Sequence, residues 1–360
     1  MTFKTRIKSI SQSVPLAGAE TLPAEVYQGA KIQLLEQTAI FESHWQYVGH
    51  VSQLPETGDL IVNEVANKPV LVVRQPDASL KAFYNVCQHR AGPLATEKGN
   101  VRNLRCRYHG WTYDLAGQLI VAPEMESTVG FKACDIKLQE VSLSQWQGFL
   151  FIAITESPPK LETVFSGIAK QIQPIDLTQL EYHHTDRYLV NCHWKVYMDN
   201  YLEGYHLPYV HPGLSKLLDY REYDTRLFDW YSYQFSPLGG DSNFYGEGQA
   251  HYYCVFPNLM LNILPNRCQV NLIVPRGDSQ CEVIFDYYYA NPDETNTQKL
   301  MADDLQFSDE IQNEDIDICE RVQKGLMSGA YDKGKLCTKR EQGVWHFQEL
   351  VRQAYRQYLS

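Results

Sequence analysis

The chain has 360 residues, of which 44% are hydrophobic and 21% are charged, so its composition predicts a globular protein of more than one domain with a sizeable core. Its formal charge of −11 argues against a nucleic-acid partner, whose phosphates require a basic surface, and no apolar run approaches the roughly 18 residues of a membrane span. The nine cysteines are scattered without a disulfide-like spacing and the N-terminus lacks a signal-peptide pattern, which predicts reduced thiols and a cytoplasmic location.

The first part of the chain is expected to contain a short helix and then a compact all-β module. The helix is predicted over residues 28–38, within an N-terminal segment that spans residues 1–44. From residue 45 to about residue 155, short β-rich runs alternate with turn residues, a pattern typical of short strands. The strands are expected at Leu60–Val65, Val70–Arg74, Lys81–Val86, Leu104–Tyr108, Gly110–Tyr113 and Gly148–Ile154, and the linker Ser157-Pro158-Pro159 ends the module.

The second part, residues 160–360, is expected to combine a sheet with several helices. Strand-like sequences lie around residues 182–191 and between residues 231 and 290. Because helices are expected before, between and after these strands, this part of the chain predicts the α+β class. The helices are expected at Leu161–Gln171, from about Trp194, at Lys299–Gly325 and at Gly343–Tyr358.

Four potential metal ligands lie in the β module, in the sequences Cys87-Gln88-His89 and Cys106-Arg107-Tyr108-His109. Zinc also binds two Cys and two His, but zinc fingers usually pair Cys with Cys and His with His. Here each half supplies one Cys and one His, which suits a two-iron cluster whose irons have different ligands. The flanking sequences CQHRAGPL and CRYHGWTYD resemble those of Rieske proteins. We therefore predict an electron-carrying [2Fe-2S] cluster at Cys87, His89, Cys106 and His109, with a structural zinc site as the alternative.

The stretch DNYLEGYHLPYVHP, residues 199–212, contains His206 and His211, separated by four residues. Two imidazoles and one carboxylate leave open coordination positions on a non-heme iron, although a bare pair of this kind is more often two ordinary histidines. On an ideal helix the two side chains would lie about 140° apart, too far for one metal. Pro208 is expected to break the helix, with His206 at its end and His211 just beyond it.

The third ligand of such a site is sought among the acids of the expected helix 299–325. Most of these acids are expected to face solvent, Glu314 and Asp317 among them. Asp315 differs because it falls on the apolar stripe of the helix, and a buried acid is costly unless it is paired or bound to metal. The residues alone make Asp315 a candidate and do not settle the choice. The stripe is formed by Ile311, Ile318, Val322 and Leu326, and the other acids are Asp303, Asp304, Asp309, Glu310 and Glu320.

Along nearly its whole length the chain resembles the oxygenase component of Rieske non-heme iron oxygenases, and most of all the carnitine and choline monooxygenase branch. The resemblance is carried by DNYLEGYHLPYVHPG, EDIDICERVQKGLMSGAY and GVWHFQELV. It implies a Rieske domain at residues 45–155, a helix-grip (START-like) catalytic domain with an antiparallel sheet at residues 160–360, and an N-terminal segment packed on the catalytic domain. It also implies that His206, His211 and Asp315 bind a mononuclear Fe(II), with Glu320 completing the E-D-x4-E pattern.

The same resemblance implies a homotrimer in which the cluster of one subunit supplies electrons to the iron of its neighbour. Glu203 occupies the position of the acid that links a cluster histidine to an iron histidine across that interface. Electrons are expected from NAD(P)H through a separate flavin and iron–sulfur reductase, because the chain has no G-x-G-x-x-G after a strand. O2 is the expected co-substrate.

The substrate is expected to be a small organic molecule, and the aromatic residues around the iron site favour an N-methylated or quaternary ammonium compound. Aromatic faces attract such cations, and a hydroxylated N-methyl group would leave as formaldehyde. A ring-hydroxylating dioxygenase acting on an aromatic substrate is the alternative enzyme, and a Rieske electron-transfer protein or a zinc-stabilised binding module are the alternatives of other classes. The aromatic residues are Tyr201, Tyr205 and Tyr209, predicted to line the substrate pocket, with Trp230, Tyr231, Tyr233 and Phe235 nearby.

Overall fold

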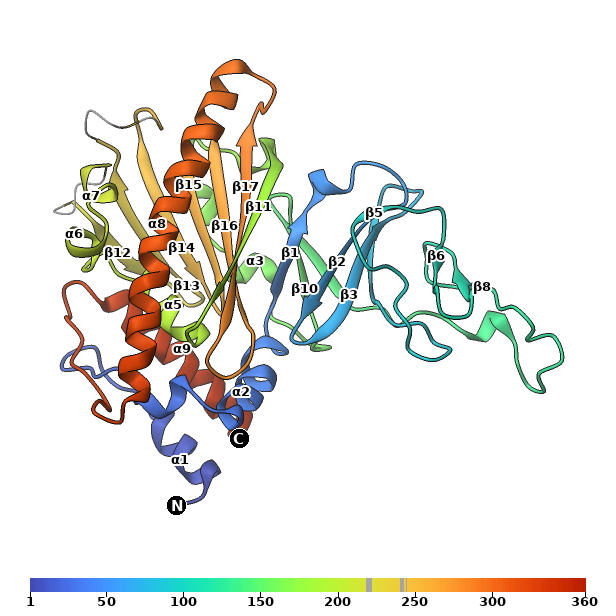
Figure 1. The fold of residues 1–360 in the computed structure, drawn as a ribbon, viewed down its shortest axis with the longest axis horizontal. Helices are drawn as coiled ribbons and strands as arrows, with labels where there is room; N and C mark the ends of the chain where they lie inside the picture. The colour runs from blue at the N-terminus through green and yellow to red at the C-terminus, as the bar shows by residue number, and fades with distance from the viewer. Residues whose placement is uncertain (218–221, 240–242, 244) are drawn as a thin grey trace. The chain divides into compact units, whose positions relative to one another are not determined.

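The structure is a computed structural model that describes residues 1–217, 222–239, 243 and 245–360 (Figure 1). The chain divides into two compact units, one formed by residues 1–40 with 162–360 and the other by residues 41–161. The first 40 residues therefore fold with the C-terminal part of the chain. Within the described residues, no helix is long and apolar enough to pass through a membrane.

The unit of residues 41–161, all of which are described, consists of short antiparallel strands in three small sheets. Their strand orders are β1-β10-β9, β4-β3-β2-β5 and β6-β7-β8. Two apolar clusters form its core, one around Phe83 and Trp111 and the other around Val70 and Leu150. This all-β arrangement confirms the predicted class of the unit. The bounds are β1 Gln46–His50, β2 Asp59–Val65, β3 Lys68–Arg74, β4 Leu80–Tyr84, β5 Gly99–Asn100, β6 Leu104–Arg105, β7 Thr112–Tyr113, β8 Leu119–Val121, β9 Ser142–Trp146 and β10 Phe149–Ala153.

The other unit is built on an antiparallel sheet, whose described strands follow the order β11-β17-β16-β15-β14-β13-β12. Helix α8 lies across this sheet in Figure 1 and contacts β11 and β17, while α5 contacts both α8 and β16. Because helices cover the sheet, β16 and β17 are buried along most of their length. The strands are β11 Leu180–Val190, β12 Asp224–Leu227, β13 Tyr231–Pro237, β14 Gln249–Val255, β15 Leu259–Leu264, β16 Arg267–Pro275 and β17 Cys281–Ala290. The sheet and its helices confirm the α+β class.

The helices include several that are only one turn long. The α-helices are α1 Phe3–Ile10, α2 Ala30–Glu36, α3 Leu161–Val164, α4 Ile168–Gln171, α5 Trp194–Tyr201, α6 Leu207–Val210, α7 Leu214–Leu217, α8 Thr295–Met327 and α9 Gln342–Leu359. The 3-10 turns are η1 Ala24–Tyr27, η3 Val51–Gln53, η4 Ala133–Asp135 and η5 Leu177–Gln179, and a π-helix, η2 Gln37–Phe41, continues α2.

Two predictions about the helices are wrong in detail. The single helix expected at Leu161–Gln171 is interrupted between α3 and α4, because Gly167 adopts a left-handed conformation with φ of 91° that a continuous α-helix does not allow.

On α8, the apolar stripe expected to be buried is displaced. Val322 is 45% exposed, and the buried face consists of Met301, Asp304, Ser308, Gln312, Cys319, Gln323 and Leu326. Most of that face is polar, so hydrophobic periodicity could not locate it.

Candidate metal centres

Two loops of the β unit present the cysteine–histidine pairs, and the backbone of each cysteine has the same hydrogen-bond pattern. In each loop the cysteine carbonyl accepts a hydrogen bond from the residue four positions later, and its N–H donates to the residue five positions later. The thiols of Cys87 and Cys106 are both buried. The loops face one another closely, since a Cβ on Gly92 in the first loop would lie 2.9 Å from Sγ of Cys106 in the second. Glycine at this position therefore permits the approach of the two loops.

The imidazoles of His89 and His109 lie together at the same place, with ring centroids 4.7 Å apart. The His89 ring stacks on Trp111 at 4.6 Å, which fixes its orientation. Its Nδ1 atom is buried and has no hydrogen-bond partner among the described residues. A buried nitrogen without a partner is costly in a finished fold, so this atom is suited to bind a group that the protein chain does not supply. The four side chains thus fit a two-iron cluster.

The two thiols lie in apolar surroundings, whereas the imidazoles lie on the side of the site that is open to solvent. Burial raises the pKa of the Cys106 thiol, and the neighbouring thiol of Cys87 raises it further. The hydroxyl of Tyr113 lies 3.3 Å from Sγ of Cys87 and can donate a hydrogen bond to a thiolate there. Cluster assembly would have to displace the thiol protons, as binding of iron to cysteine generally does.

The second group of ligands lies between α5 and α7, where the local structure differs from the prediction. Helix α5 already ends at Tyr201, and Pro208 does not break a helix but stands in the first turn of α6. Proline is well tolerated there because its nitrogen would have no helical partner. His206 and His211 cap the two ends of this four-residue helix, and their ring centroids are 5.0 Å apart. A single short turn therefore brings both imidazoles to one side.

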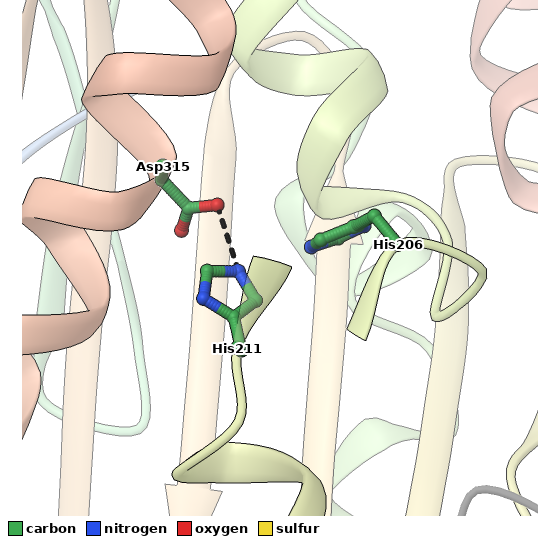
Figure 2. Close-up of side chains that lie close together, drawn as sticks. All are labelled: His206, His211 and Asp315. Carbon is green, nitrogen blue, oxygen red and sulfur yellow. Dashed lines mark hydrogen bonds and ion pairs between the residues drawn. The ribbon is translucent and has the colours of Figure 1, made fainter. Parts of the chain in front are cut away.

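Asp315 of α8 completes the group. Ligand atoms of His206, His211 and Asp315 all lie within 4.8 Å of one another, and Nε2 of His211 is 3.0 Å from Oδ1 of Asp315 (Figure 2). The His211 side chain is almost fully buried, while those of His206 and Asp315 are largely buried. Two imidazoles and one carboxylate at this spacing fit a single metal ion, and this set suits iron with open coordination positions.

Carboxylates hold the opposite nitrogen of each imidazole. Oε1 of Glu203 lies 2.6 Å from Nδ1 of His206, and Oε2 of Glu314 lies 2.7 Å from Nδ1 of His211. This geometry keeps the Nδ1 proton in place and leaves Nε2 free to bind a metal. Burial acts to lower the pKa of His211, but the hydrogen bonds and charges of Asp315 and Glu314 raise it overall. The prediction that Glu314 is only a surface charge is wrong.

Asp315 is itself positioned by Asn200, whose Nδ2 donates to Oδ1 of Asp315 at 2.6 Å. Sequence reasoning missed Asn200 and Glu314, because neither lies on the expected stripe or in a ligand spacing. Glu320, expected to complete the acidic pattern, accepts hydrogen bonds from the backbone and side chain of Asn191. Its contacts indicate that it joins α8 to the segment that precedes α5.

A cavity of about 890 Å³, counting its open mouth, extends from these ligands. Tyr201 lines it, and its hydroxyl donates to Oδ1 of Asn262 at 2.7 Å. Tyr205, which precedes α6, and Tyr209, which lies in it, are not among the described lining residues and are 46% and 81% exposed. The other aromatic residues of the lining are Tyr197, Tyr223, Tyr245, Tyr252, Phe285 and Phe307.

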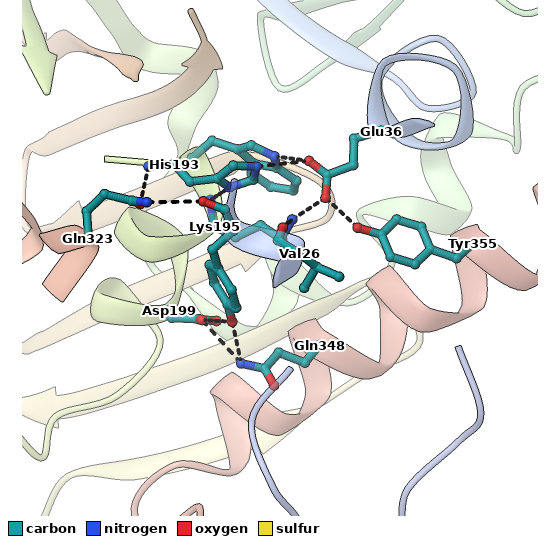
Figure 3. A network of polar contacts seen from close by, with 10 residues as sticks. Val26, Glu36, His193, Lys195, Asp199, Gln323, Gln348 and Tyr355 are labelled. Atoms are coloured by element: carbon teal, nitrogen blue, oxygen red, sulfur yellow. Dashed lines mark hydrogen bonds and ion pairs between the residues drawn. The ribbon is translucent and has the colours of Figure 1, made fainter. Parts of the chain in front are cut away.

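A buried polar network anchors the start of α5, the helix that leads to this site (Figure 3). Glu36 of α2 pairs with Nζ of Lys195 and accepts from Trp194 Nε1 at 2.7 Å and from the Tyr355 hydroxyl at 2.5 Å. The side chains of Lys195 and Glu36 are 0% and 2% exposed. The network thereby ties α2 and α9 to α5. Further along α5, burial raises the pKa of Asp199 to about 7, although Tyr27 donates a hydrogen bond to it at 2.6 Å.

Comparison with known protein families gives two matches. Residues 44–141 match the Rieske [2Fe-2S] domain, and residues 177–357 match the ring hydroxylating alpha subunit (catalytic domain). Among individual proteins, the chain is 32% identical to choline monooxygenase of Arabidopsis thaliana over 96% of this chain and 85% of that protein. It is 29% identical to the carnitine monooxygenase oxygenase subunit of Escherichia coli strain K12 over 94% of each chain.

Solved structures agree with these matches. The quaternary ammonium Rieske monooxygenase CntA in complex with L-carnitine superimposes with a TM-score of 0.85 at 26% identity, over 96% of this chain and 99% of that one. A naphthalene 1,2-dioxygenase shares the fold, with a TM-score of 0.81 at 17% identity over 97% and 95% of the two chains. The matched domains cover both units, and the chain belongs to the Rieske non-heme iron oxygenases, as an oxygenase component that uses a Rieske [2Fe-2S] cluster, a mononuclear non-heme iron and O2.

Proposed function

We propose that this oxygenase hydroxylates a quaternary ammonium compound at a carbon next to the nitrogen, with oxidative loss of a methyl group or cleavage of a C–N bond. The observation that carries the proposal is the cavity that opens from His206, His211 and Asp315 and has five tyrosines in its lining. Aromatic faces attract a quaternary ammonium group, which cannot donate hydrogen bonds. The curated relatives named for choline and carnitine support the same substrate class.

Seven residues would hold the two iron groups. Cys87 and Cys106 would bind one iron of the cluster and His89 and His109 the other, while His206, His211 and Asp315 would bind the mononuclear iron. When bound, that iron supplies the open positions at which O2 is activated. Metal analysis would separate this assignment from the zinc alternative, because zinc in place of iron at Cys87, His89, Cys106 and His109 would exclude the electron-carrying cluster.

The other residues of the site have positioning roles. Glu203 and Glu314 orient the two imidazoles, and Asn200 orients the carboxylate of Asp315. Tyrosine rings around the cavity would exclude water from the ammonium group and hold it against the ligands. The reaction takes two electrons and two protons for each O2, and it places one oxygen atom in the substrate and one in water.

The electrons would come from NAD(P)H through a separate reductase and pass between subunits of a homotrimer. Support for electron transfer between subunits comes from the solved relative, whose structure is described as revealing it. Glu203 lies where such a path would end, because its carboxylate joins His206 and is 12% exposed. A cytoplasmic location is part of the same proposal.

The variant Glu203→Gln is expected to keep both iron groups and to slow turnover at least about tenfold, because the amide orients His206 less well and carries no charge for the electron path. Metal analysis and single-turnover reduction of the mononuclear site by a pre-reduced cluster provide the measurement. Glu222→Gln, an exposed acid outside the cavity lining, is the matched control. Unchanged electron transfer in Glu203→Gln would remove the bridging role.

Oxygen uptake with a surrogate reductase tests the function itself. Uptake coupled to γ-butyrobetaine, L-carnitine or choline, with formaldehyde or trimethylamine as a product, is expected. Coupled uptake with naphthalene or another simple aromatic, and none with the ammonium compounds, would instead favour the ring-hydroxylating alternative. Metal content separates the remaining classes, since about three irons per chain are expected for an oxygenase and two for an electron carrier.

A further inference from the structure

Strand β16 presents an unusual row of polar side chains to the cavity. Arg267, Gln269 and Asn271 alternate along the strand, so they share one face of the sheet. All three line the cavity, and none is more than 4% exposed. Buried polar groups, and above all a buried cation, are costly unless partners satisfy them. The row is therefore either fully paired inside the protein or prepared for a ligand.

Arg267 is paired only in part. Its Nε donates to Oδ2 of Asp304 at 2.8 Å and its Nη2 donates to Oε1 of Gln269 at 2.6 Å. No hydrogen bond of Nη1 is seen among the described residues, and the guanidinium carbon lies 5.6 Å from the centre of the Tyr245 ring. Arg267 is not the only donor to Asp304. The hydroxyls of Tyr245 and Tyr289 each donate a hydrogen bond to its carboxylate at 2.6 Å. The guanidinium thus retains N–H groups toward the cavity while the charge of Asp304 is shared among three donors.

Two further polar atoms of the lining have no partner among the described residues. They are Oδ1 of Asn271 and Nε2 of Gln312, and both are buried. Gln312 comes from α8 and Asn271 from β16, and both residues line the cavity. A donor and an acceptor left over on two separate elements of the lining indicate that the cavity is built to surround a polar ligand.

The position of Arg267 relative to the iron ligands follows from α8. Phe307, Ser308, Ile311, Gln312 and Asp315 all line the cavity, so the cavity runs along this helix. Asp304, the partner of Arg267, precedes Asp315 by 11 residues, which is about 16 Å along the helix axis. Arg267 therefore lies at the end of the cavity remote from the iron ligands. Among the described lining residues it is the one lysine or arginine.

Resting on the proposed function, we infer that Arg267 binds the carboxylate of a zwitterionic substrate whose quaternary ammonium group lies toward His206, His211 and Asp315. Planar N–H groups of arginine match a carboxylate, and the pairing with Asp304 holds the guanidinium in place before substrate arrives. Gln269 and Asn271 line the path between the two ends. Arg267 is accordingly the specificity-determining residue that makes the enzyme prefer betaines to choline.

Binding to the iron-loaded wild-type protein under anaerobic conditions, measured by calorimetry, tests the inference. The probes are γ-butyrobetaine, its methyl ester, which keeps the ammonium group and loses the negative charge, and choline. A charge-assisted hydrogen bond lost from the complex is expected to weaken binding of the ester at least about tenfold relative to γ-butyrobetaine. The same preference is expected in kcat/KM for coupled oxygen uptake.

Variants locate the preference at Arg267. The double variant Arg267→Met with Asp304→Asn removes both charges of the buried pair, which avoids leaving one charge alone. It is expected to bring the affinities for γ-butyrobetaine and its methyl ester within about twofold of each other. Arg267→Lys keeps the charge and is expected to retain part of the preference. The control is Arg276→Met, an arginine that pairs with Glu282 and does not line the cavity.

Each outcome has a distinct meaning. Equal affinity of the wild-type protein for the ester and γ-butyrobetaine, with turnover of either, would overturn the role of Arg267 and leave the proposed function standing. A preference that persists in the double variant would also overturn it. If no ammonium compound binds or is turned over, both proposals fail, while uptake with a simple aromatic would replace them.

Discussion

The variant Asp315→Ala is expected to lose the mononuclear iron and more than about 99% of substrate-coupled oxygen uptake, while keeping the [2Fe-2S] cluster. Loss of a residue that only orients a metal ligand typically lowers metal affinity or activity 10- to 100-fold, so loss of a ligand should cost at least as much. Asp315 would supply the one carboxylate of the site, and its Oδ1 lies 3.0 Å from Nε2 of His211. The cluster ligands lie in the other unit of the chain and should be unaffected.

Iron analysis and the low-temperature EPR spectrum of the reduced protein measure this outcome. The expected iron content falls from about three to about two per chain, with an unchanged Rieske signal. Asp317→Ala is the matched control, because Asp317 lies two residues further along the same helix, has a side chain that is 63% exposed, and pairs with Arg321 at the surface. Full iron content and full oxygen uptake in Asp315→Ala would show that another residue is the third ligand.

The variant Lys195→Met is expected to lower the free energy of unfolding by about 3–5 kcal/mol, because it leaves the carboxylate of Glu36 buried without its cation. In a unit of this size the apparent Tm should fall by about 10 °C. Lys335→Met is the control, since its ion pair with Glu20 is at the surface, with side chains 71% and 45% exposed, and should contribute little to stability. Thermal unfolding and urea unfolding of the three proteins provide the measurement.

The pH dependence of stability gives an independent check on the same pair. Burial acts to raise the pKa of Glu36, but the charges and hydrogen bonds of Lys195 and His193 lower it to about 2, below the ordinary value of 4.5. The contribution of an acid with a lowered pKa is present above its ordinary value and is lost as the pH falls toward the lowered one. The wild-type protein should therefore lose stability between pH 4.5 and 2, and Lys195→Met should lose less over that window. A parallel acid dependence of both proteins would contradict the assignment.

The Rieske domain and the grouping of His206 with His211 could be predicted from the sequence, because the residues concerned lie close together along the chain. Cys87 and His89, or His206 and His211, need only one short loop or helix to meet. The fold class followed from strand-like runs and helical periodicity in the same way. Local failures arose where backbone conformation decided the outcome, as at Gly167, which divides the helix expected at residues 161–171.

Features that depend on contacts between distant segments could not be predicted. The sequence predicted Glu314 to be a surface acid, but in the fold it pairs with His211, which lies 103 residues away in the sequence. Asp304 and Ser308 on the buried face of α8 form hydrogen bonds with Arg267 and with tyrosines of the sheet, so the apolar stripe of the sequence did not mark that face. The network around Glu36 joins segments up to 319 residues apart, and no local pattern indicates it.

Helix α8 also has a consequence for which molecules the enzyme can accept. Asp304, the partner of Arg267, and Asp315 lie on one uninterrupted helix, so α8 fixes the distance between the proposed carboxylate site and the proposed iron ligands. That separation can change only in steps along the helix, and one turn corresponds to about 5.4 Å. A counter-charge placed one turn nearer to Asp315, at the position of Ser308, would select shorter betaines. The spacing along the helix would then determine which length of carbon chain between ammonium and carboxylate the enzyme accepts.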